Sequence, residues 1–256
     1  MKAVEIAGLL EKFSPSRYAC EWDNVGMNVG RDENEVGRIL VCLDIDDAAV
    51  EYALQKGADM IVSHHPLIFH GLKKINDGGF ISRRVLTLAE NRVNAFCMHT
   101  NFDSTHMAFE AAKRLGLEPE SVLEEVCGGK GIGVVGELSG AVSASELAMI
   151  VKKSFGLEHV VMYGDRDTKI ERAALVPGSG KDEIALALDA GAQAIVTGDI
   201  TYHYGIDGAA QNIVIIDAGH YGLEHIFIDI VADYLERCAD NAEIIRMPFD
   251  NPQKYF

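Results

Sequence analysis

Two adjacent imidazoles, His64 and His65, directly follow the apolar run 60–62. Imidazole is the commonest neutral metal ligand, and the carboxyl end of a buried strand is where open α/β sheets bind ligands. Successive strand side chains point to opposite faces, so the two rings converge only if the chain bends after Ser63. The fixed φ of Pro66 favours such a bend. The pair therefore indicates a metal site, with an ordinary surface loop as the alternative.

Two further polar clusters follow apolar runs in the same way. His99 and Asp103 come after one run, and His220 and Glu224 come after another. In a mostly parallel sheet the carboxyl ends of the strands share one edge, so distant segments can meet there. His220 and Glu224 are four residues apart and share a helix face if a helix starts after Gly219. The three clusters are therefore expected to converge.

The converging side chains comprise three imidazoles and two carboxylates: His64, His65, Asp103, His220 and Glu224. One catalytic divalent ion commonly takes three protein ligands and water, so five ligands fit two ions better. Zinc, iron(II) and manganese all suit this mixed ligand set. The alternatives are that Asp103 caps a helix beginning near Ser104, and that the last two residues lie on a solvated helix face.

Five segments of the chain, in this order, resemble one family: WDNVG (22–26), SHHPL (63–67), HTNFD (99–103), PGSGKD (177–182) and DAGH (217–220). They are similar to the GTP cyclohydrolase I type 2 homologues, also described as NIF-three-like dinuclear metal centre proteins. The resemblance runs over nearly the whole chain. It implies that the five residues named above bind two metal ions. It also implies that His99 lies beside them, where it orients a ligand or transfers a proton, and that the protein forms a toroidal hexamer.

The composition limits the class of protein. The chain has 256 residues, of which 48% are hydrophobic, enough for a substantial core, and a net charge of −16. That charge argues against binding duplex nucleic acid, which needs clustered Lys and Arg. The five cysteines show no metal-binding spacing and suit a reducing compartment. Because the sequence shows neither a signal peptide nor an apolar run of about 20 residues, we expect a cytoplasmic protein without a membrane partner.

An internal duplication predicts the fold class. Residues 40–63 align without gaps with residues 174–197, at a constant offset of 134. Each copy shows the pattern strand, turn, helix, glycine, strand, which is a βαβ unit. Gly57 and Gly191 fall where a left-handed residue ends a helix. We therefore expect an α/β protein of two similar lobes, each with a mostly parallel sheet flanked by helices.

The two copies differ at the point where the chemistry is expected. His64 and His65 align with Gly198 and Asp199, so the second copy lacks the imidazole pair. The predicted organisation is a first α/β lobe, a second α/β lobe, and a C-terminal segment that returns to complete the metal site: 1–125, 126–211 and 212–256.

Two glycine-rich segments resemble nucleotide-binding motifs. Residues 131–136 (GIGVVG) match the dinucleotide fingerprint as a string but lie within an apolar run, whereas the fingerprint needs a helix opening on its last glycine. The next helix signal is a capping box at Ser143 and Glu146, so a glycine-rich strand is expected. Residues 178–181 (GSGK) form either a structural turn or a phosphate-holding loop at a helix N-terminus.

The leading functional hypothesis is a metal-dependent hydrolase that acts on a nucleotide. The family resemblance implies opening of the GTP imidazole ring with loss of formate. Hydrolysis of a phosphate ester uses the same parts. The alternative is a non-enzymatic, oligomeric metal-binding scaffold that recruits a protein or nucleic-acid partner.

Overall fold

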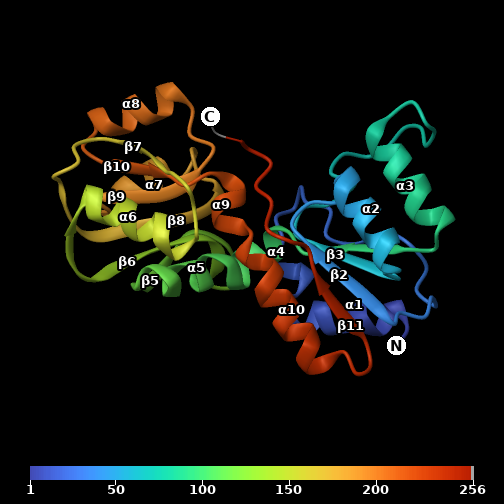
Figure 1. Ribbon diagram of the computed structural model, residues 1–256. Coiled ribbons are helices and arrows are strands. Elements are labelled where there is room, and N and C mark those ends of the chain that lie inside the picture. Colours follow the sequence, from blue (N-terminus) through green and yellow to red (C-terminus); the bar gives the residue numbers. More distant parts are fainter. Residues whose placement is uncertain (255–256) are drawn as a thin grey trace. The chain divides into compact units, whose positions relative to one another are not determined.

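The protein divides into two compact units in a computed structural model that describes residues 1–254. The first unit comprises Met1–Phe102 with Phe227–Asp250, and the second comprises Asp103–Ile226 with the described part of Asn251–Phe256 (Figure 1). The chain thus passes three times from one unit to the other. The lobe ranges expected from the sequence, 1–125, 126–211 and 212–256, were placed around the duplicated segments rather than around these units. They stay a prediction.

The sheet of the first unit is mostly parallel, as expected. Its strand order is β1-β4-β3-β2-β11, in which β1 alone pairs antiparallel among the described strands. The residues of β3 and β4 are buried throughout, because helices cover both faces of a parallel sheet. The strands are β1 (Gly26–Val29), β2 (Arg38–Cys42), β3 (Met60–Ser63), β4 (Asn94–Cys97) and β11 (Glu243–Arg246).

Helices cover both faces of this sheet. Figure 1 shows α2 and α3 on one face and α1 and α10 on the other. On the second face, the rings of Phe13 and Tyr234 stack with centroids 4.0 Å apart, and Tyr234 Oη donates a hydrogen bond to the Leu9 carbonyl at 2.9 Å. The helices are α1 (Ala3–Phe13), a 3-10 turn (Ser16–Tyr18), α2 (Asp47–Lys56), α3 (Phe80–Glu90), α4 (Thr100–Phe102) and α10 (Ile226–Cys238).

The sheet of the second unit is mixed, with strand order β5-β6-β8-β9-β10-β7. Its strands are β5 (Leu117–Cys127), β6 (Lys130–Ser143), β7 (Val161–Tyr163), β8 (Lys169–Ser179), β9 (Ala194–Gly198) and β10 (Val214–Asp217). The run β8-β9-β10 is parallel. The other pairings are antiparallel, so the expectation of a mostly parallel sheet is wrong here. The causes are the hairpin β5-β6, which adds antiparallel strands in front of the duplicated βαβ segment, and β7, which pairs antiparallel with β10 at the other edge.

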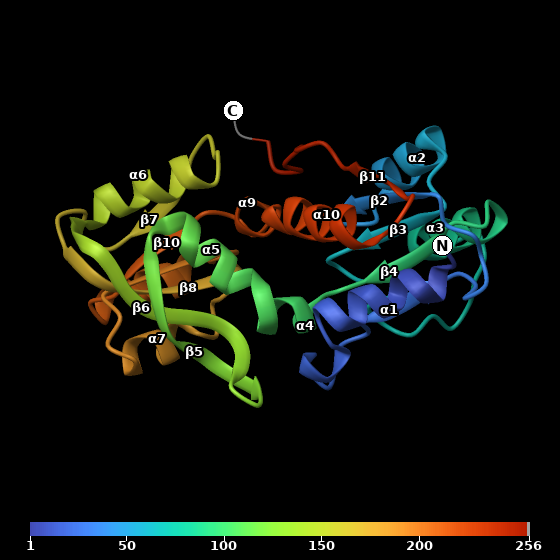
Figure 2. The same cartoon turned by 90° about the horizontal axis from the view of Figure 1, so that it is seen from below.

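The helices of the second unit lie on both faces of its sheet. Figure 2 shows α5 and α6 on the face opposite α7. Ser143 caps α6 with a capping box to Glu146, as predicted. The helical segments are a π-helical turn (Asp103–Met107), α5 (Ala108–Leu115), α6 (Ala144–Ser154), α7 (Ile184–Asp189), α8 (Tyr202–Ala210) and α9 (His220–Glu224).

The predicted duplication is present as two βαβ segments, β2–α2–β3 and β8–α7–β9. Leu40 pairs with Ile61 in the first copy, and Ala174 pairs with Ile195 in the second, each 134 positions further along. Gly57 and Gly191 have φ values of 64° and 74°. The two copies therefore share the strand register as well as the pattern of elements.

The glycine-rich run 131–136 lies inside β6, as predicted, and not at a nucleotide-binding turn. A Cβ at Gly131 would overlap the Glu124 carbonyl oxygen of β5, and one at Gly136 would overlap the carbonyl oxygen of Glu118. These glycines are therefore needed for the close approach of two strands.

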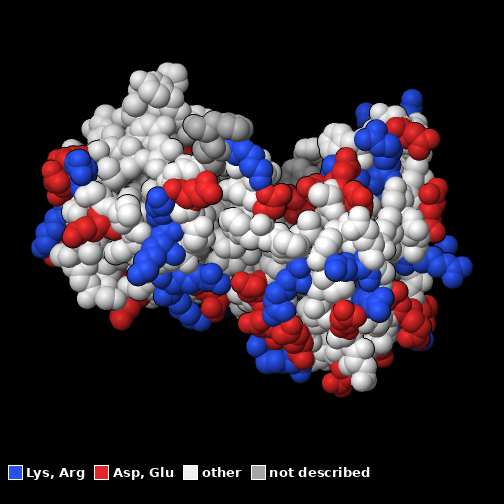
Figure 3. All heavy atoms as spheres, in the orientation of Figure 1, with Lys and Arg blue, Asp and Glu red and all other residues white. Residues whose placement is uncertain are grey.

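The surface carries both signs of charge. Figure 3 shows Lys and Arg side chains interspersed with Asp and Glu side chains on the face that it draws. Among residues 1–254, no helix has the length and apolar character needed to cross a membrane.

Candidate metal centre

In the first unit, His64 and His65 lie just beyond the end of β3, where the backbone bends as expected. The His65 amide donates to the Leu43 carbonyl at 3.0 Å, and Ser63 Oγ donates to the His65 carbonyl at 2.8 Å. These bonds bend the chain so that the two rings lie close together, with centroids 4.9 Å apart. His64 is fully buried, whereas His65 is partly exposed.

His99 joins this pair from the end of the neighbouring strand β4. One ring nitrogen of each of the three histidines lies within 4.8 Å of the others. The ring centroid of His99 is 5.3 Å from that of His64 and 5.5 Å from that of His65. Because β3 and β4 are adjacent and parallel, their carboxyl ends bring the three imidazoles together. His99 thus belongs to a cluster of three histidines that could hold a metal ion.

Each imidazole of this cluster is oriented by an acceptor at Nδ1. His64 Nδ1 donates to the Met98 carbonyl at 2.8 Å, His65 Nδ1 to Asp44 at 2.8 Å, and His99 Nδ1 to Asp23 at 2.9 Å. Carbonyl and carboxylate oxygens accept, so the proton of the neutral ring is on Nδ1 and the lone pair is on Nε2. Metal-binding histidines are held in this way. The donor set of the first unit therefore fits a divalent cation.

Asp23 explains the prominence of the WDNVG segment. Its side chain is fully buried and accepts hydrogen bonds at 2.9 Å from His99 Nδ1 and from the Thr100 amide. Thr100 Oγ1 donates a third, at 2.5 Å. Burial favours the neutral acid, but the bonds from His99 and Thr100 outweigh it and lower the pKa of Asp23 to about 2. Asp23 is thus a fixed anion that orients His99.

In the second unit, α9 begins at His220, directly after Gly219, as predicted. His220 Nε2 lies 2.9 Å from a carboxylate oxygen of Glu224, which is only 3% exposed. This burial excludes the alternative of a solvated helix face for Glu224. His220 Nδ1 donates to Asp199 at 2.8 Å, so this histidine too is held by an aspartate.

Asp103 lies within the same unit as Glu224, and one carboxylate oxygen of each lies within 4.8 Å of the other. The helical segment begins at Thr100 and continues through a π-helical turn that starts at Asp103. Asp103 is therefore not the cap of a helix beginning near Ser104, because it lies inside the helical segment. Glu224 thus has a candidate ligand atom of His220 and one of Asp103 near it, and these three residues are the second donor group.

The turn before α9 is built around Asp217, the last residue of β10. Its two carboxylate oxygens each accept a backbone hydrogen bond at 2.9 Å, from the amides of Ile200 and Gly219. Burial raises the pKa of Asp217 above its usual range. Since β10 belongs to the sheet of the second unit, the expectation that all three clusters share one sheet edge is wrong for His220 and Glu224.

The GSGK loop supports Glu224 through its first glycine. Gly178 has a φ of 79°, and a Cβ there would overlap Glu224 Oε1. A non-glycine residue rarely adopts this left-handed conformation, and it would displace the carboxylate. The backbone of the loop therefore packs against an acid, which favours the structural turn over the phosphate-holding alternative. Lys181, at its end, lies over the ring of Tyr204.

Three aspartates that accept hydrogen bonds from histidine Nδ1 atoms were not predicted from the sequence: Asp23, Asp44 and Asp199. The duplication contains a signal for one of them, because Asp199 occupies the position equivalent to His65. The second copy thus has an aspartate that orients a histidine where the first copy has the histidine itself. Asp44 lies 21 positions before His65, and only the fold brings the two together.

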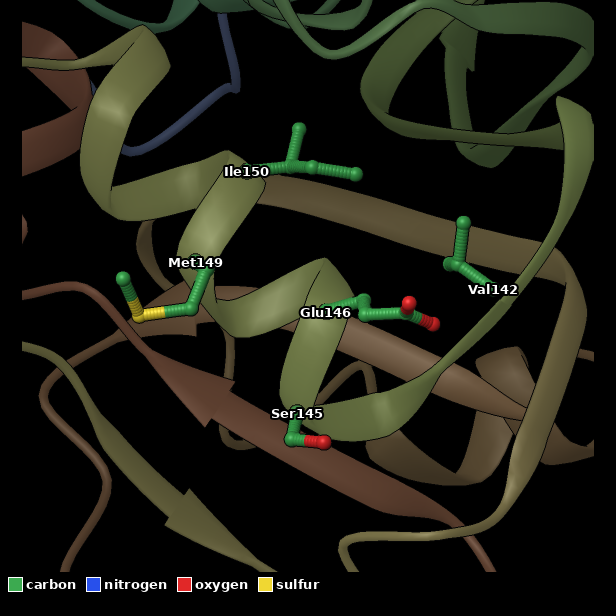
Figure 4. Close-up of a pocket in the computed structure, with 5 residues that line it drawn as sticks. All are labelled: Val142, Ser145, Glu146, Met149 and Ile150. Carbon is green, nitrogen blue, oxygen red and sulfur yellow. The ribbon is translucent and has the colours of Figure 1, made fainter.

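A surface groove of about 440 Å³ lies elsewhere in the second unit. Figure 4 shows that its lining residues come from α6 and the end of β6: Val142, Ser145, Glu146, Met149 and Ile150. Its one ionisable side chain, Glu146, already bonds the amide and hydroxyl of Ser143 in the capping box. The groove therefore lacks the donors of a catalytic site.

The fold and the donor groups together define a class: a two-unit α/β protein with a cluster of three histidines that could hold a metal ion in its first unit and further candidate metal ligands in its second. The chain belongs to the family Duf34/NIF3 (NGG1p interacting factor 3), whose model matches residues 1–252. The resemblance identified from the five sequence segments is thereby confirmed.

Individual relatives agree with this assignment over nearly their whole length. The chain is 33% identical over 241 residues to a GTP cyclohydrolase 1 type 2 homolog of Clostridium acetobutylicum, with 92% of this chain and 90% of the relative covered. It is 34% identical over 231 residues to GTP cyclohydrolase 1 type 2 of Helicobacter pylori, with 90% of each covered. The crystal structure of Staphylococcus aureus protein SA1388 has 25% identity and a TM-score of 0.90, covering 100% of this chain and 99% of that one.

Proposed function

We propose that the protein binds two divalent metal ions and hydrolyses a nucleotide with their help. The proposed ligands are those predicted from the sequence, two from the first unit and three from the second: His64, His65, Asp103, His220 and Glu224. The observation that carries the proposal is that His64 and His65 lie in a cluster of three histidines, and that Glu224 has candidate ligand atoms of His220 and Asp103 near it. Zinc, iron(II) and manganese all suit the donor set.

The side chains around these ligands have chemical roles that follow from their contacts. A divalent cation bound here would supply a Lewis acid and lower the pKa of a coordinated water. Asp44 and Asp199 hold His65 and His220 through Nδ1. Asp23 holds His99 with its Nε2 toward the other two imidazoles and stabilises the ring when it is protonated. We propose His99 as the group that accepts and returns the proton of the reaction.

The choice of a nucleotide, and of GTP in particular, as the proposed substrate rests on the names of the relatives. Opening of the GTP imidazole ring with loss of formate is the reaction that the family name implies. Fold similarity does not carry activity with it, so hydrolysis of a phosphate ester in a nucleotide is tested beside it. The same resemblance underlies the proposal of a toroidal hexamer. The proposal of a cytoplasmic location rests instead on the cysteines, whose usage suits a reducing compartment.

Metal content is the first test. We would measure metal per chain by mass spectrometry of untagged protein, with His220→Ala as the test variant. His203→Ala is the matched control, because His203 is exposed on α8. About two ions per chain are expected in the wild type and the control, and fewer in His220→Ala. One ion or none in protein that has not been exposed to chelators would contradict the paired-metal proposal.

Turnover is the second test. Metal-loaded protein is mixed with GTP, and formate and inorganic phosphate are measured separately. Asp103→Ala should abolish either product while leaving the circular dichroism spectrum unchanged, since Asp103 is proposed to act only through the metal. Turnover that survives in Asp103→Ala would refute its assignment.

The second candidate function is an oligomeric metal-binding scaffold. Its support is an exposed apolar face of α8, where Tyr202 and Ile206, four residues apart, are 65% and 39% exposed. Exposed apolar surface of this kind marks interaction sites. Metal-loaded protein without turnover of any nucleotide, together with partner binding that persists after chelation, would favour the scaffold. Light scattering at several protein concentrations tests the hexamer in either case.

A further inference from the structure

Two large aromatic side chains of the first unit, Trp22 and Phe69, are exposed beside the histidine cluster. Trp22 is 61% exposed and Phe69 is 45% exposed. Their ring centroids are 5.7 Å apart with the planes inclined by 57°. Each also meets His99 edge-on, with centroid distances of 6.0 Å from Trp22 and 6.2 Å from Phe69. The three rings form one contiguous aromatic surface.

The segments that carry these rings are tied to each other. Asn24 Nδ2 donates to the Ile68 carbonyl at 2.6 Å, and the Ile68 amide donates to Asn28 Oδ1 at 3.1 Å. Ile68 precedes Phe69, and Asn24 follows Trp22 by two residues. Between Trp22 and Asn24, the buried Asp23 is held by His99 and Thr100. The backbone therefore places both rings before any ligand arrives, which reduces the entropy cost of binding.

Single exposed aromatic residues are common and need no explanation. Here, two of them contact each other and an imidazole of the candidate metal centre. Aromatic pairs prefer tilted or offset contacts, and an aromatic ring that is exposed to this extent can also stack on a planar π system. Stacking a nucleobase on such a face contributes about 1–3 kcal/mol per base.

We propose that Trp22 and Phe69 form the platform that stacks the base of the nucleotide substrate beside His99. The proposal rests on the proposed function in naming a nucleotide as the substrate. It requires neither bound metal nor turnover, so it can fail or succeed independently of them. The chemical class that the platform recognises is a planar heteroaromatic ring.

Trp22 makes the proposal directly measurable, because it is the only tryptophan in the chain. Metal-free, full-length protein is excited at the tryptophan absorption edge and titrated with GTP, guanosine and inorganic triphosphate. N-acetyltryptophanamide in the same solutions corrects for absorption by the ligands. GTP and guanosine should quench the fluorescence saturably with similar affinities, and inorganic triphosphate should leave it unchanged.

Variants test whether guanosine binds to the platform. Phe69→Leu and Trp22→Leu are compared with Phe80→Leu by calorimetric titration with guanosine. Phe80 is a matched control, since it is 58% exposed in the same unit and lies at the start of α3. From the energy of stacking, each platform variant should weaken binding by about 5- to 100-fold, and Phe80→Leu should bind as the wild type does. Leucine keeps apolar bulk, and a thermal melt of each variant confirms that it is folded.

The outcomes separate the platform from the metal chemistry. Absence of guanosine quenching, or equal guanosine affinity in the wild type, Trp22→Leu and Phe69→Leu, would overturn the platform. Inorganic triphosphate binding as tightly as GTP would also overturn it, because the phosphates would then account for recognition. Guanosine binding that depends on both rings, in a protein without turnover, would support the platform while the hydrolase proposal failed.

Discussion

Four histidines of the candidate centre share one arrangement, in which Nδ1 donates to a fixed oxygen. The acceptors are the Met98 carbonyl and the carboxylates of Asp44, Asp23 and Asp199. A histidine held in this way keeps one tautomer and one ring orientation, so Nε2 is ready to bind a cation without further ordering. The aspartates therefore influence how well the histidines bind a metal ion.

Replacing Asp23 by Asn tests this dependence. The variant keeps the shape but loses the charge that holds His99 and Thr100. Turnover should fall about 10- to 100-fold, because Asp23 orients the proposed proton-transfer group, and the free energy of unfolding should fall by about 1–3 kcal/mol. Product release from GTP and urea unfolding measure the two effects. Asp77→Asn is the control, because Asp77 is exposed in the same unit. Turnover equal to that of the wild type would exclude the proposed proton-transfer role of His99.

Replacing Gly178 by Ala tests the support of Glu224. The methyl group would overlap Glu224 Oε1 in a backbone with a φ of 79°, at a cost of about 1–3 kcal/mol of unfolding free energy. The metal content of the protein should also fall, since the Glu224 carboxylate must move. Gly140→Ala is the matched control, because a Cβ there meets open space. Its stability should change by less than about 0.5 kcal/mol. Equal stability and equal metal content in the two variants would contradict this account.

At the scale of elements, parallel strands bring the first donor group together. β3 and β4 are neighbours that run in the same direction, so the residues that follow them meet at one edge. The second donor group depends on helices instead, with α9 placing His220 and Glu224 four residues apart. Both units contain a copy of the duplicated βαβ segment, but only the copy in the first unit is followed by a pair of histidines.

The capping box of α6 supplies a test of helix stability in the second unit. Ser143 Oγ accepts a hydrogen bond from the Glu146 amide, and the Glu146 carboxylate accepts one from the Ser143 amide. Ser143→Ala should lower the free energy of unfolding by about 0.5–2 kcal/mol, measured by urea unfolding. Ser154→Ala at the other end of α6 should leave stability unchanged or slightly higher, since alanine is the better helix former. Equal loss in both variants would show that the cap contributes nothing.

At the scale of the whole molecule, the proposed ligands come from both compact units. Metal binding should therefore stabilise both units, since it favours the folded form of each. The net charge of −16 strengthens this expectation, because cations reduce the repulsion among the acids.

Metal removal tests the expectation. A free metal concentration of about 100 times the dissociation constant should add about 2.7 kcal/mol to the free energy of unfolding, seen as a higher Tm that a chelator reverses. His203→Ala should show the same shift and His220→Ala a smaller one. A Tm that is independent of metal in the wild type would argue against a metal site formed by these residues.

Much of this arrangement was predictable from local patterns. Apolar runs followed by His64, His99 and His220 identified the strand ends, and the offset of 134 predicted two βαβ segments with one register. Such features are readable because strand burial, helix caps and left-handed glycines depend on neighbouring residues. The antiparallel pairing of β5 and β6, the position of Asp103 inside a π-helical turn, and the aspartates that hold the imidazoles were not predicted. They depend on contacts between residues far apart in the chain: Asp23 and His99 are 76 positions apart. Sequence spacing carries little information about such pairs, because their distance is set by the packing of whole elements.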